Sequence, residues 1–256
     1  MREGYTHIAV VLDRSGSMGS CKSVTIEGLN SFINKQKMVK GEGTITLVQF
    51  DDCYEVNYDF LPLENTPLLT DSSYVPRGMT ALLDAIGRTI DETGAKLAAL
   101  PENKRPARVI IVIQTDGLEN SSTKYISPPS SFDINVRSFQ HIQSYDKGAR
   151  VREMIKHQQE KYNWDFVFLG AGQDAIATAI NYGINAKSAM TYDTDNSVQA
   201  FNSVSNYTSS YRSAPNMRSA KLCSFSDEDR ENAVDASTTS NVSSSKKKGH
   251  TSSKVS

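Results

Sequence analysis

Apolar positions follow two different spacings along the first 212 residues. Five apolar runs of six to eight residues predict strands, and the first and third of them are continuous enough to be buried on both faces of a sheet. The runs are HIAVVL (7–12), GTITLVQF (43–50), RVIIVIQT (108–115), WDFVFLG (164–170) and KSAMTY (187–192). CYEVNY (53–58) alternates apolar and polar residues after a tight turn, which predicts a strand antiparallel to 43–50.

Between these strands, apolar residues recur three or four positions apart, which is the spacing of an amphipathic helix. The helical segments cover 22–38, 80–90, 151–155, 176–180 and 198–211. Strands that alternate with helices are joined by right-handed crossovers and form an open, mostly parallel sheet. We therefore predict a doubly wound α/β fold with helices on both faces and one antiparallel edge strand.

The composition changes at about Ser213, where serine, threonine, asparagine and lysine become dominant. Such a segment buries too little apolar surface to order itself. We therefore predict one domain over 1–212 and a disordered tail over 213–256.

Residues 121–147 show no period and follow the fourth strand of the chain directly. Long irregular loops in compact domains are usually functional or disordered. We predict a rim insertion here, in which Phe132, Phe139, His141 and Tyr145 form part of a partner-recognition surface. A mobile, solvated insertion is an equally good interpretation.

The candidate chemistry lies where strands end. Asp13 ends the first strand and is followed by Ser15 and Ser17, Asp116 follows the strand 108–115, and Thr80 opens a helix. Each segment taken alone is also a good helix cap or turn. In a doubly wound sheet, however, the first strand and the strand that returns to its other side are neighbours, and ligands bind at that point. We therefore expect the three segments to converge.

Two carboxylates and three hydroxyls at one point make an all-oxygen environment of the kind that Mg²⁺ prefers. In this interpretation Ser15, Ser17 and Thr80 supply neutral direct ligands, while Asp13 and Asp116 orient waters and balance charge. Because hydroxyls donate little charge, the ion would remain electron-poor. An open coordination position would then favour an acidic side chain from another protein. Mn²⁺ is the alternative metal.

The same residues resemble a known family. DRSGS (13–17), the threonine of GMTALLDAI (78–86) and the aspartate of TDGLEN (115–120) are similar to the metal-ion-dependent adhesion site (MIDAS) of von Willebrand factor A domains. The stretch 162–184 also resembles bacterial and bacteriophage members. The resemblance covers about 5–211 and implies a Rossmann-like fold. It is weakest after the aspartate, so the roles of Glu119 and Asn120 stay open.

By this resemblance, Ser15 and Ser17 bind the metal directly, Thr80 joins them in the ligand-bound state, and Asp13 and Asp116 act mainly through water. The family implies a module for protein–protein interaction, in bacteria sometimes beside AAA+ ATPases, and in a phage for virion assembly or capture of a host protein.

Two other classes of function stay open. One is a structural or assembly protein that oligomerises independently of metal, and the other is a metal-dependent hydrolase. The sequence pairs no nucleophile with a base, so we expect no catalysis.

Charge, cysteine content and the length of the apolar runs limit the partners and the cellular location that we expect. With 28 basic and 29 acidic residues the formal net charge is −1, which favours neither nucleic acid nor an anionic membrane as partner. The three cysteines are dispersed and form no metal or disulfide framework. Since no apolar stretch approaches the roughly 20 residues of a membrane span, we expect a cytoplasmic protein. The oligomeric state is left undetermined.

Overall fold

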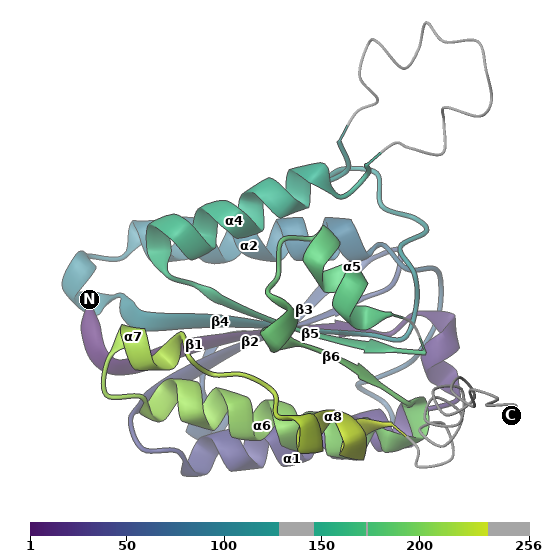
Figure 1. The fold of residues 1–256 in the computed structure, drawn as a ribbon, viewed down its shortest axis with the longest axis horizontal. Coiled ribbons are helices and arrows are strands. Elements are labelled where there is room, and N and C mark those ends of the chain that lie inside the picture. Colours follow the sequence, from purple (N-terminus) through teal and green to yellow (C-terminus); the bar gives the residue numbers. More distant parts are fainter. Residues whose placement is uncertain (128–145, 173, 235–256) are drawn as a thin grey trace, which may run out of the picture.

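The computed structural model describes residues 1–127, 146–172 and 174–234 (Figure 1). Within them a six-stranded sheet has the order β3-β2-β1-β4-β5-β6. All neighbouring strands are parallel except β2 and β3, which form the antiparallel edge. The strands are β1 (Arg2–Asp13), β2 (Glu42–Phe50), β3 (Tyr54–Pro62), β4 (Pro106–Thr115), β5 (Asp165–Ala171) and β6 (Ala189–Tyr192).

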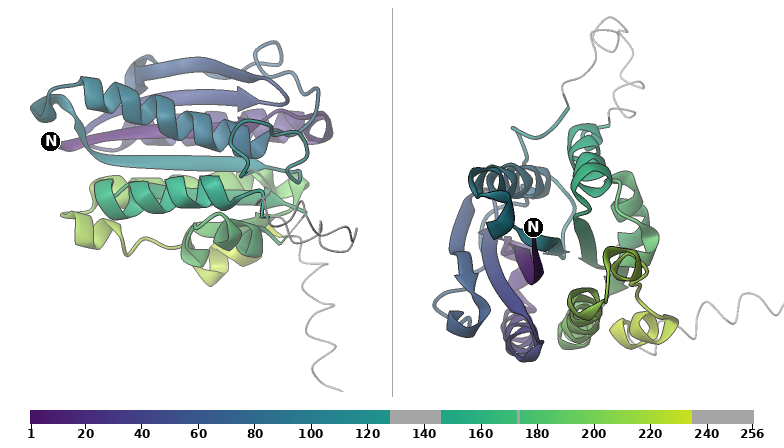
Figure 2. Two further views of the ribbon diagram at one scale, coloured as in Figure 1. Left: turned by 90° about the horizontal axis from the view of Figure 1, so that it is seen from above. Right: turned by 90° about the vertical axis from the view of Figure 1, so that its left-hand side faces the viewer.

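Helices cover both faces of this sheet (Figures 1 and 2). They are α1 (Lys22–Met38), α2 (Leu82–Ala99), α4 (Ala149–Tyr162), α5 (Ala175–Asn181), α6 (Ser197–Ser213), α7 (Met217–Ala220) and α8 (Asp227–Ala233). One face packs against α1, α6, α7 and α8, and the other against α2, α4 and α5. The predicted doubly wound, mostly parallel fold is confirmed.

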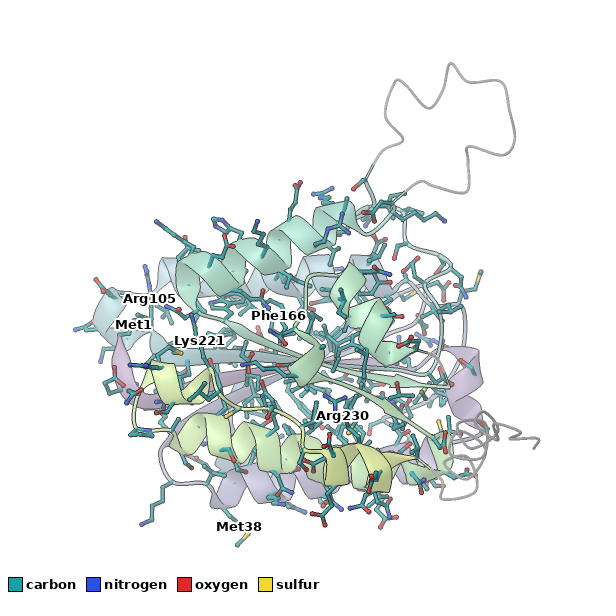
Figure 3. All side chains as sticks on the ribbon, viewed as in Figure 1. Met1, Met38, Arg105, Phe166, Lys221 and Arg230 are labelled. Atoms are coloured by element: carbon teal, nitrogen blue, oxygen red, sulfur yellow. The ribbon has the colours of Figure 1, made fainter. Side chains whose placement is uncertain are left out.

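Alternate residues of the central strands enter two separate cores. In β1, Ile8, Val10 and Leu12 face α1 and α6, whereas Ala9 and Val11 face α2 and α4. Every one of these side chains is fully buried, as is Phe166 of β5, whereas Met38 at the end of α1 projects outward (Figure 3). Burial on both faces is what the continuous apolar runs predict.

The strand order reverses between β1 and β4, because the chain winds outward through β2 and β3 before it returns to the other side of β1. Leu12 pairs with Gln114 in this parallel register, so the residues that follow each strand emerge side by side. The parallel strands point to the right in Figure 1, away from the N-terminus. The expected ligand position therefore lies at the carboxyl ends of β1 and β4, on the right in Figure 1.

The prediction that a disordered tail begins at Ser213 is wrong for the residues up to 234. The segment after α6 forms α7 and α8, and it buries Ala220, Phe225 and Ala233 in the α1/α6 core. Arg230 of α8 donates to the carbonyl oxygens of Ala186 at 3.0 Å and Ala189 at 2.6 Å (Figure 3). A few buried apolar side chains and one partly buried guanidinium thus accompany the ordering of this polar segment.

Two other predictions fall outside the described residues. The remainder of the expected tail, 235–256, is one of them. The other is the aromatic part of the rim insertion, with Phe132, Phe139, His141 and Tyr145. None of the helices in the described ranges combines the length and apolar character of a membrane-spanning segment.

Candidate metal centre

The loop between β1 and α1 carries the first three candidate ligands. It leaves the sheet at Asp13 and tightens into a 3-10 helix, Gly16–Gly19. Asp13 is fully buried, and its Oδ1 accepts the backbone N–H of Ser15 at 2.7 Å. The hydroxyls of Ser15 and Ser17 lie 3.1 Å apart. Asp13 thus folds the loop back so that both hydroxyls share one side of it.

The end of β4 joins this loop through two hydrogen bonds. The Thr115 hydroxyl donates to Asp13 Oδ2 at 2.6 Å, and the Ser17 hydroxyl donates to Asp116 Oδ1 at 2.7 Å. Both contacts connect residues about a hundred positions apart in the sequence. The structure therefore brings together Asp13, Ser15, Ser17 and Asp116, as the strand order requires.

Thr80 approaches from a third loop. A Cβ built on Gly117 would lie 3.1 Å from the Thr80 Oγ1 and 3.8 Å from the Ser17 Oγ. Both hydroxyls therefore lie close to the glycine that follows Asp116. Because Thr80 is only 3 % exposed, its hydroxyl is held at the site rather than free in solvent.

The position of the Thr80 loop is fixed from both sides. Gly16 N–H donates to the Gly78 carbonyl at 3.2 Å, and Gly78 has a φ of +67°, which favours glycine. On the other side, Asn120 Oδ1 accepts Thr80 N–H at 2.8 Å while Asn120 N–H donates to the Thr80 carbonyl at 3.0 Å. The sequence left the role of Asn120 open, and the structure assigns it to holding Thr80.

Glu119 has a different role. Its Oε2 accepts Leu83 N–H at 2.9 Å, and its Oε1 accepts the backbone N–H of Ser122 at 2.7 Å. It therefore binds free N–H groups in the first turn of α2 and fixes the segment after Asp116 to that helix. Glu119 acts as a helix cap and not as part of the oxygen cluster.

Burial sets the protonation of the two acidic residues. Burial raises the pKa of Asp13 to about 6, although the hydrogen bonds from Thr115 and Ser15 oppose the shift. Burial likewise raises the pKa of Asp116, against the hydrogen bond from Ser17. Among the described residues, no lysine, arginine or histidine forms an ion pair with either carboxylate.

This arrangement fits a divalent cation. A buried carboxylate without a counter-charge is costly, and a cation would remove that cost. The donor set consists entirely of oxygen, and Ser17 is exposed, so it can be reached from solvent. Hard cations such as Mg²⁺ and Mn²⁺ take such donors.

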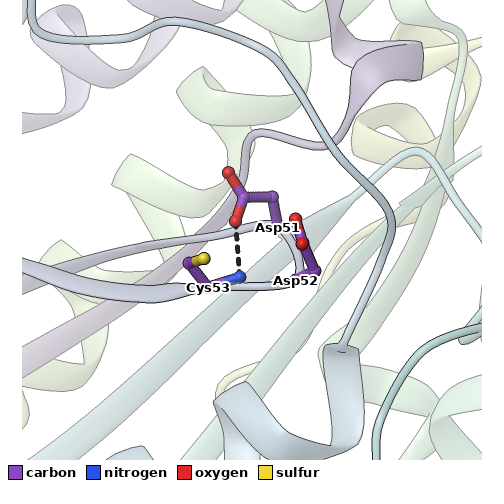
Figure 4. A group of neighbouring side chains, drawn as sticks. All are labelled: Asp51, Asp52 and Cys53. Carbon is purple, nitrogen blue, oxygen red and sulfur yellow. Dashed lines mark hydrogen bonds between the residues drawn. The ribbon is translucent and has the colours of Figure 1, made fainter.

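A second cluster of acidic residues lies at the same end of the sheet, in the turn between β2 and β3. One ligand atom from each of Asp51, Asp52 and Cys53 lies within 4.8 Å of the others (Figure 4). The fully buried Asp51 already has cationic partners, because its Oδ2 accepts from Arg14 Nε at 3.0 Å and from Arg77 Nε at 2.9 Å. A metal here would have to displace two guanidinium groups.

Asp51 instead connects the two loops that carry the hydroxyls. Arg14 lies between Asp13 and Ser15, and Arg77 precedes Thr80 by three positions. Burial alone would raise the pKa of Asp51, but the hydrogen bonds from Cys53 and Arg77 and the charges of both arginines lower it. This carboxylate therefore stays ionised and holds the Thr80 loop to the serine loop.

Comparison with known proteins establishes the fold. Neither a protein-family model nor a curated protein sequence matches the chain. Among solved structures, it is similar to proximal thread matrix protein 1 from the mussel byssus, with a zinc-occupied MIDAS motif. The TM-score is 0.51 and the identity 15 %, over 81 % of this chain and 46 % of the mussel protein. The chain thus spans about half the length of that protein.

A bacterial structure is similar over nearly its whole length. It is the von Willebrand factor domain of the type V pili tip protein Mfa5 from Porphyromonas gingivalis, with a TM-score of 0.50 and 13 % identity. The match covers 79 % of this chain and 94 % of that domain. The fold expected from the sequence motifs, that of a von Willebrand factor A domain, is therefore confirmed.

Proposed function

We propose that this chain, which has the von Willebrand factor A fold, is a non-catalytic binding module that holds one divalent cation and, through it, an acidic residue of another protein. The observation that carries the proposal is a pair of carboxylates, the fully buried Asp13 and the partly buried Asp116, with the hydroxyls of Ser15, Ser17 and Thr80 beside them; neither carboxylate pairs with a basic side chain of the described residues. The mussel structure with zinc in its MIDAS motif gives the same expectation for this fold.

The residues divide the work by charge and exposure. Ser15, Ser17 and Thr80 would hold the cation with neutral oxygens, and Asp13 and Asp116 would orient waters and hydroxyls around it. When bound, the cation supplies an electron-poor centre that accepts one further carboxylate oxygen. We propose Mg²⁺ as the metal, with Mn²⁺ as the alternative.

Titration calorimetry with Mg²⁺ and with Mn²⁺ tests the metal site, with capped glutamate supplied in a second series. We expect one site in the wild type and about 10- to 100-fold weaker binding in Asp13→Asn, because residues that orient a metal's ligands change its affinity by such factors. Asp52→Asn is the matched control, since it removes an exposed carboxylate from the neighbouring turn.

Three results would contradict the proposal. They are no metal uptake even with a carboxylate present, equal uptake by wild type and Asp13→Asn, and loss of uptake in Asp52→Asn. The last result would place the metal in the β2–β3 turn. Assembly of the chain that is unchanged by EDTA would favour the structural alternative.

A further inference from the structure

Three exposed apolar side chains lie on the loops that carry the candidate metal centre. Val75, Met79 and Leu118 are 48 %, 54 % and 68 % exposed. Each is adjacent in sequence to a residue that touches or forms the site. Tyr74 donates its hydroxyl to the Asp13 carbonyl at 2.6 Å. Met79 precedes Thr80, and Leu118 follows Gly117.

Met79 and Leu118 lie on two loops that meet at the Thr80 hydroxyl. Thr80 Oγ1 is 3.1 Å from the Cβ position of Gly117, so the two loops that carry these side chains are in contact. Met79 lies between Gly78, whose carbonyl accepts Gly16 N–H, and Thr80, whose N–H donates to Asn120. Leu118 lies between Gly117 and the helix cap Glu119. Both backbones are thus fixed, while neither side chain enters a core.

The opposite flank of the centre is acidic. A hollow of about 370 Å³ beside Asp116 is lined also by Asp193 and Asp195. A partner with several acidic residues in a row would place like charges against this wall. The exposed apolar side chains therefore lie on the loops beside Thr80, where Asp52 is the neighbouring carboxylate, whereas several carboxylates line the hollow beside Asp116.

From this asymmetry we infer that the partner presents a single carboxylate whose neighbouring residues are apolar and pack on Met79 and Leu118, with Val75 at the margin. This inference rests on the proposed function. Loops with a fixed backbone lose little freedom on binding, and removing apolar area from water favours association. The carboxylate would supply attachment and the apolar neighbours selectivity.

Selection from a display library of short random peptides, with Mg²⁺ present and elution by EDTA, tests the inference. We expect the wild type to enrich peptides that carry one aspartate or glutamate with leucine, isoleucine, methionine or phenylalanine beside it. Met79→Ser/Leu118→Ser should still enrich the acidic residue but lose the apolar preference. The wild-type peptides should bind this double variant at least about tenfold more weakly.

Ile180→Ser/Leu222→Ser is the matched control, since these apolar side chains are 53 % and 75 % exposed. Ile180 lies in a hollow with Asp165, which is the first residue of β5 and so at the other end of the strands. This variant should select the same peptides as the wild type. Equal melting temperatures for all three proteins would show that the exposed positions can be changed without loss of the fold.

Acidic peptides without an apolar preference, or a preference that survives Met79→Ser/Leu118→Ser, would overturn the inference and leave the proposed function intact. A change in sedimentation of Met79→Ser/Leu118→Ser, with none in the control variant, would also overturn it. In that case a second copy of the chain covers Met79 and Leu118 in the wild type. If the wild type enriches no acidic residue that depends on metal, the proposed function itself fails.

Discussion

Two buried carboxylates at the ends of neighbouring strands differ in what balances their charge. Asp51, at the end of β2, accepts hydrogen bonds from Arg14 and Arg77. Within the described part of the chain, the hydrogen bonds to Asp13, the last residue of β1, come from uncharged donors on Ser15 and Thr115. A buried charge is costly without a partner, and Asp51 has its cations within the chain, whereas for Asp13 we propose a cation from outside.

The contrast supports a structural role for Asp51 and the proposed metal-binding role for Asp13. Both aspartates have the same side chain and no measurable exposure, so neither residue type nor burial distinguishes them. The same substitution, aspartate to asparagine, should therefore have opposite effects on the stability of the metal-free protein.

The largest effect is expected at Asp51. Asp51→Asn removes the negative charge between two guanidinium groups and leaves Arg14, which is 5 % exposed, with Glu55 as its remaining ion pair. Breaking one partner of a buried pair costs about 3–5 kcal/mol. Urea unfolding in EDTA should show this loss, with Asp52→Asn unchanged as control. An unchanged midpoint in Asp51→Asn would mean that the arginines find equivalent partners, and the contrast would fail.

The opposite sign is expected at Asp13. At pH 8 its carboxyl is ionised in the metal-free protein although burial raises its pKa to about 6, compared with 3.8 for the ordinary group. At most about 3 kcal/mol of charge burial is relieved in Asp13→Asn, because each pKa unit is worth about 1.4 kcal/mol. The variant should therefore unfold at higher urea than the wild type in EDTA.

Added Mg²⁺ should reverse this order. It stabilises only a protein that binds it, so the wild type should gain free energy of unfolding and Asp13→Asn should not. If Asp13→Asn is less stable than the wild type in EDTA, the wild-type Asp13 carboxylate already has a favourable partner within the protein. The metal proposal then loses its main support.

The sequence predicted the fold and the oxygen cluster because both depend on patterns that are local. Continuous apolar runs gave the buried strands, and each candidate ligand stood directly after such a run or before a helix. The strand order then required only that β4 return to the free side of β1. Asp13 and Asp116 could be placed together without any side-chain geometry.

The residues that hold the cluster in place could not be found in this way. Thr115 contacts Asp13 across 102 positions, Asn120 contacts Thr80 across 40, and Asp51 contacts Arg14 across 37. Each is a common polar residue whose role depends on which loop lies opposite, and no local pattern encodes that.

The helices after Ser213 were missed for a different reason. α7 spans four residues and α8 seven, too few for an apolar period to appear. One signal was present, because Ser226 and Asp229 form a reciprocal capping box at the start of α8. A serine-rich composition hid it.

His7 offers a third way to bury an ionisable group, and the smallest of the expected effects. Its ring is fully buried, stacked on Phe60 at 3.7 Å, with Nδ1 and the Thr44 hydroxyl 3.0 Å apart. Burial, assisted by the charge of Lys96, lowers the pKa of His7 from 6.5 to about 3. Whereas Asp51 keeps its charge beside arginines, His7 avoids the need for a counter-charge by staying neutral.

The consequence is a loss of stability in acid. Between pH 6.5 and about 3 the unfolded chain binds a proton at His7 that the folded protein does not, so the free energy of unfolding falls as the pH is lowered through this window. At pH 5 the loss is about 2 kcal/mol. The raised pKa values of Asp13 and Asp165 act in the opposite direction, because the folded protein takes up protons there more readily than the unfolded chain.

Urea unfolding of wild type and His7→Phe at pH 7 and pH 5 separates the contributions, since only the difference between the two proteins reports on His7. That difference should move by about 2 kcal/mol in favour of His7→Phe at pH 5, and a difference that is the same at both pH values would show that the fold does not lower the pKa of His7.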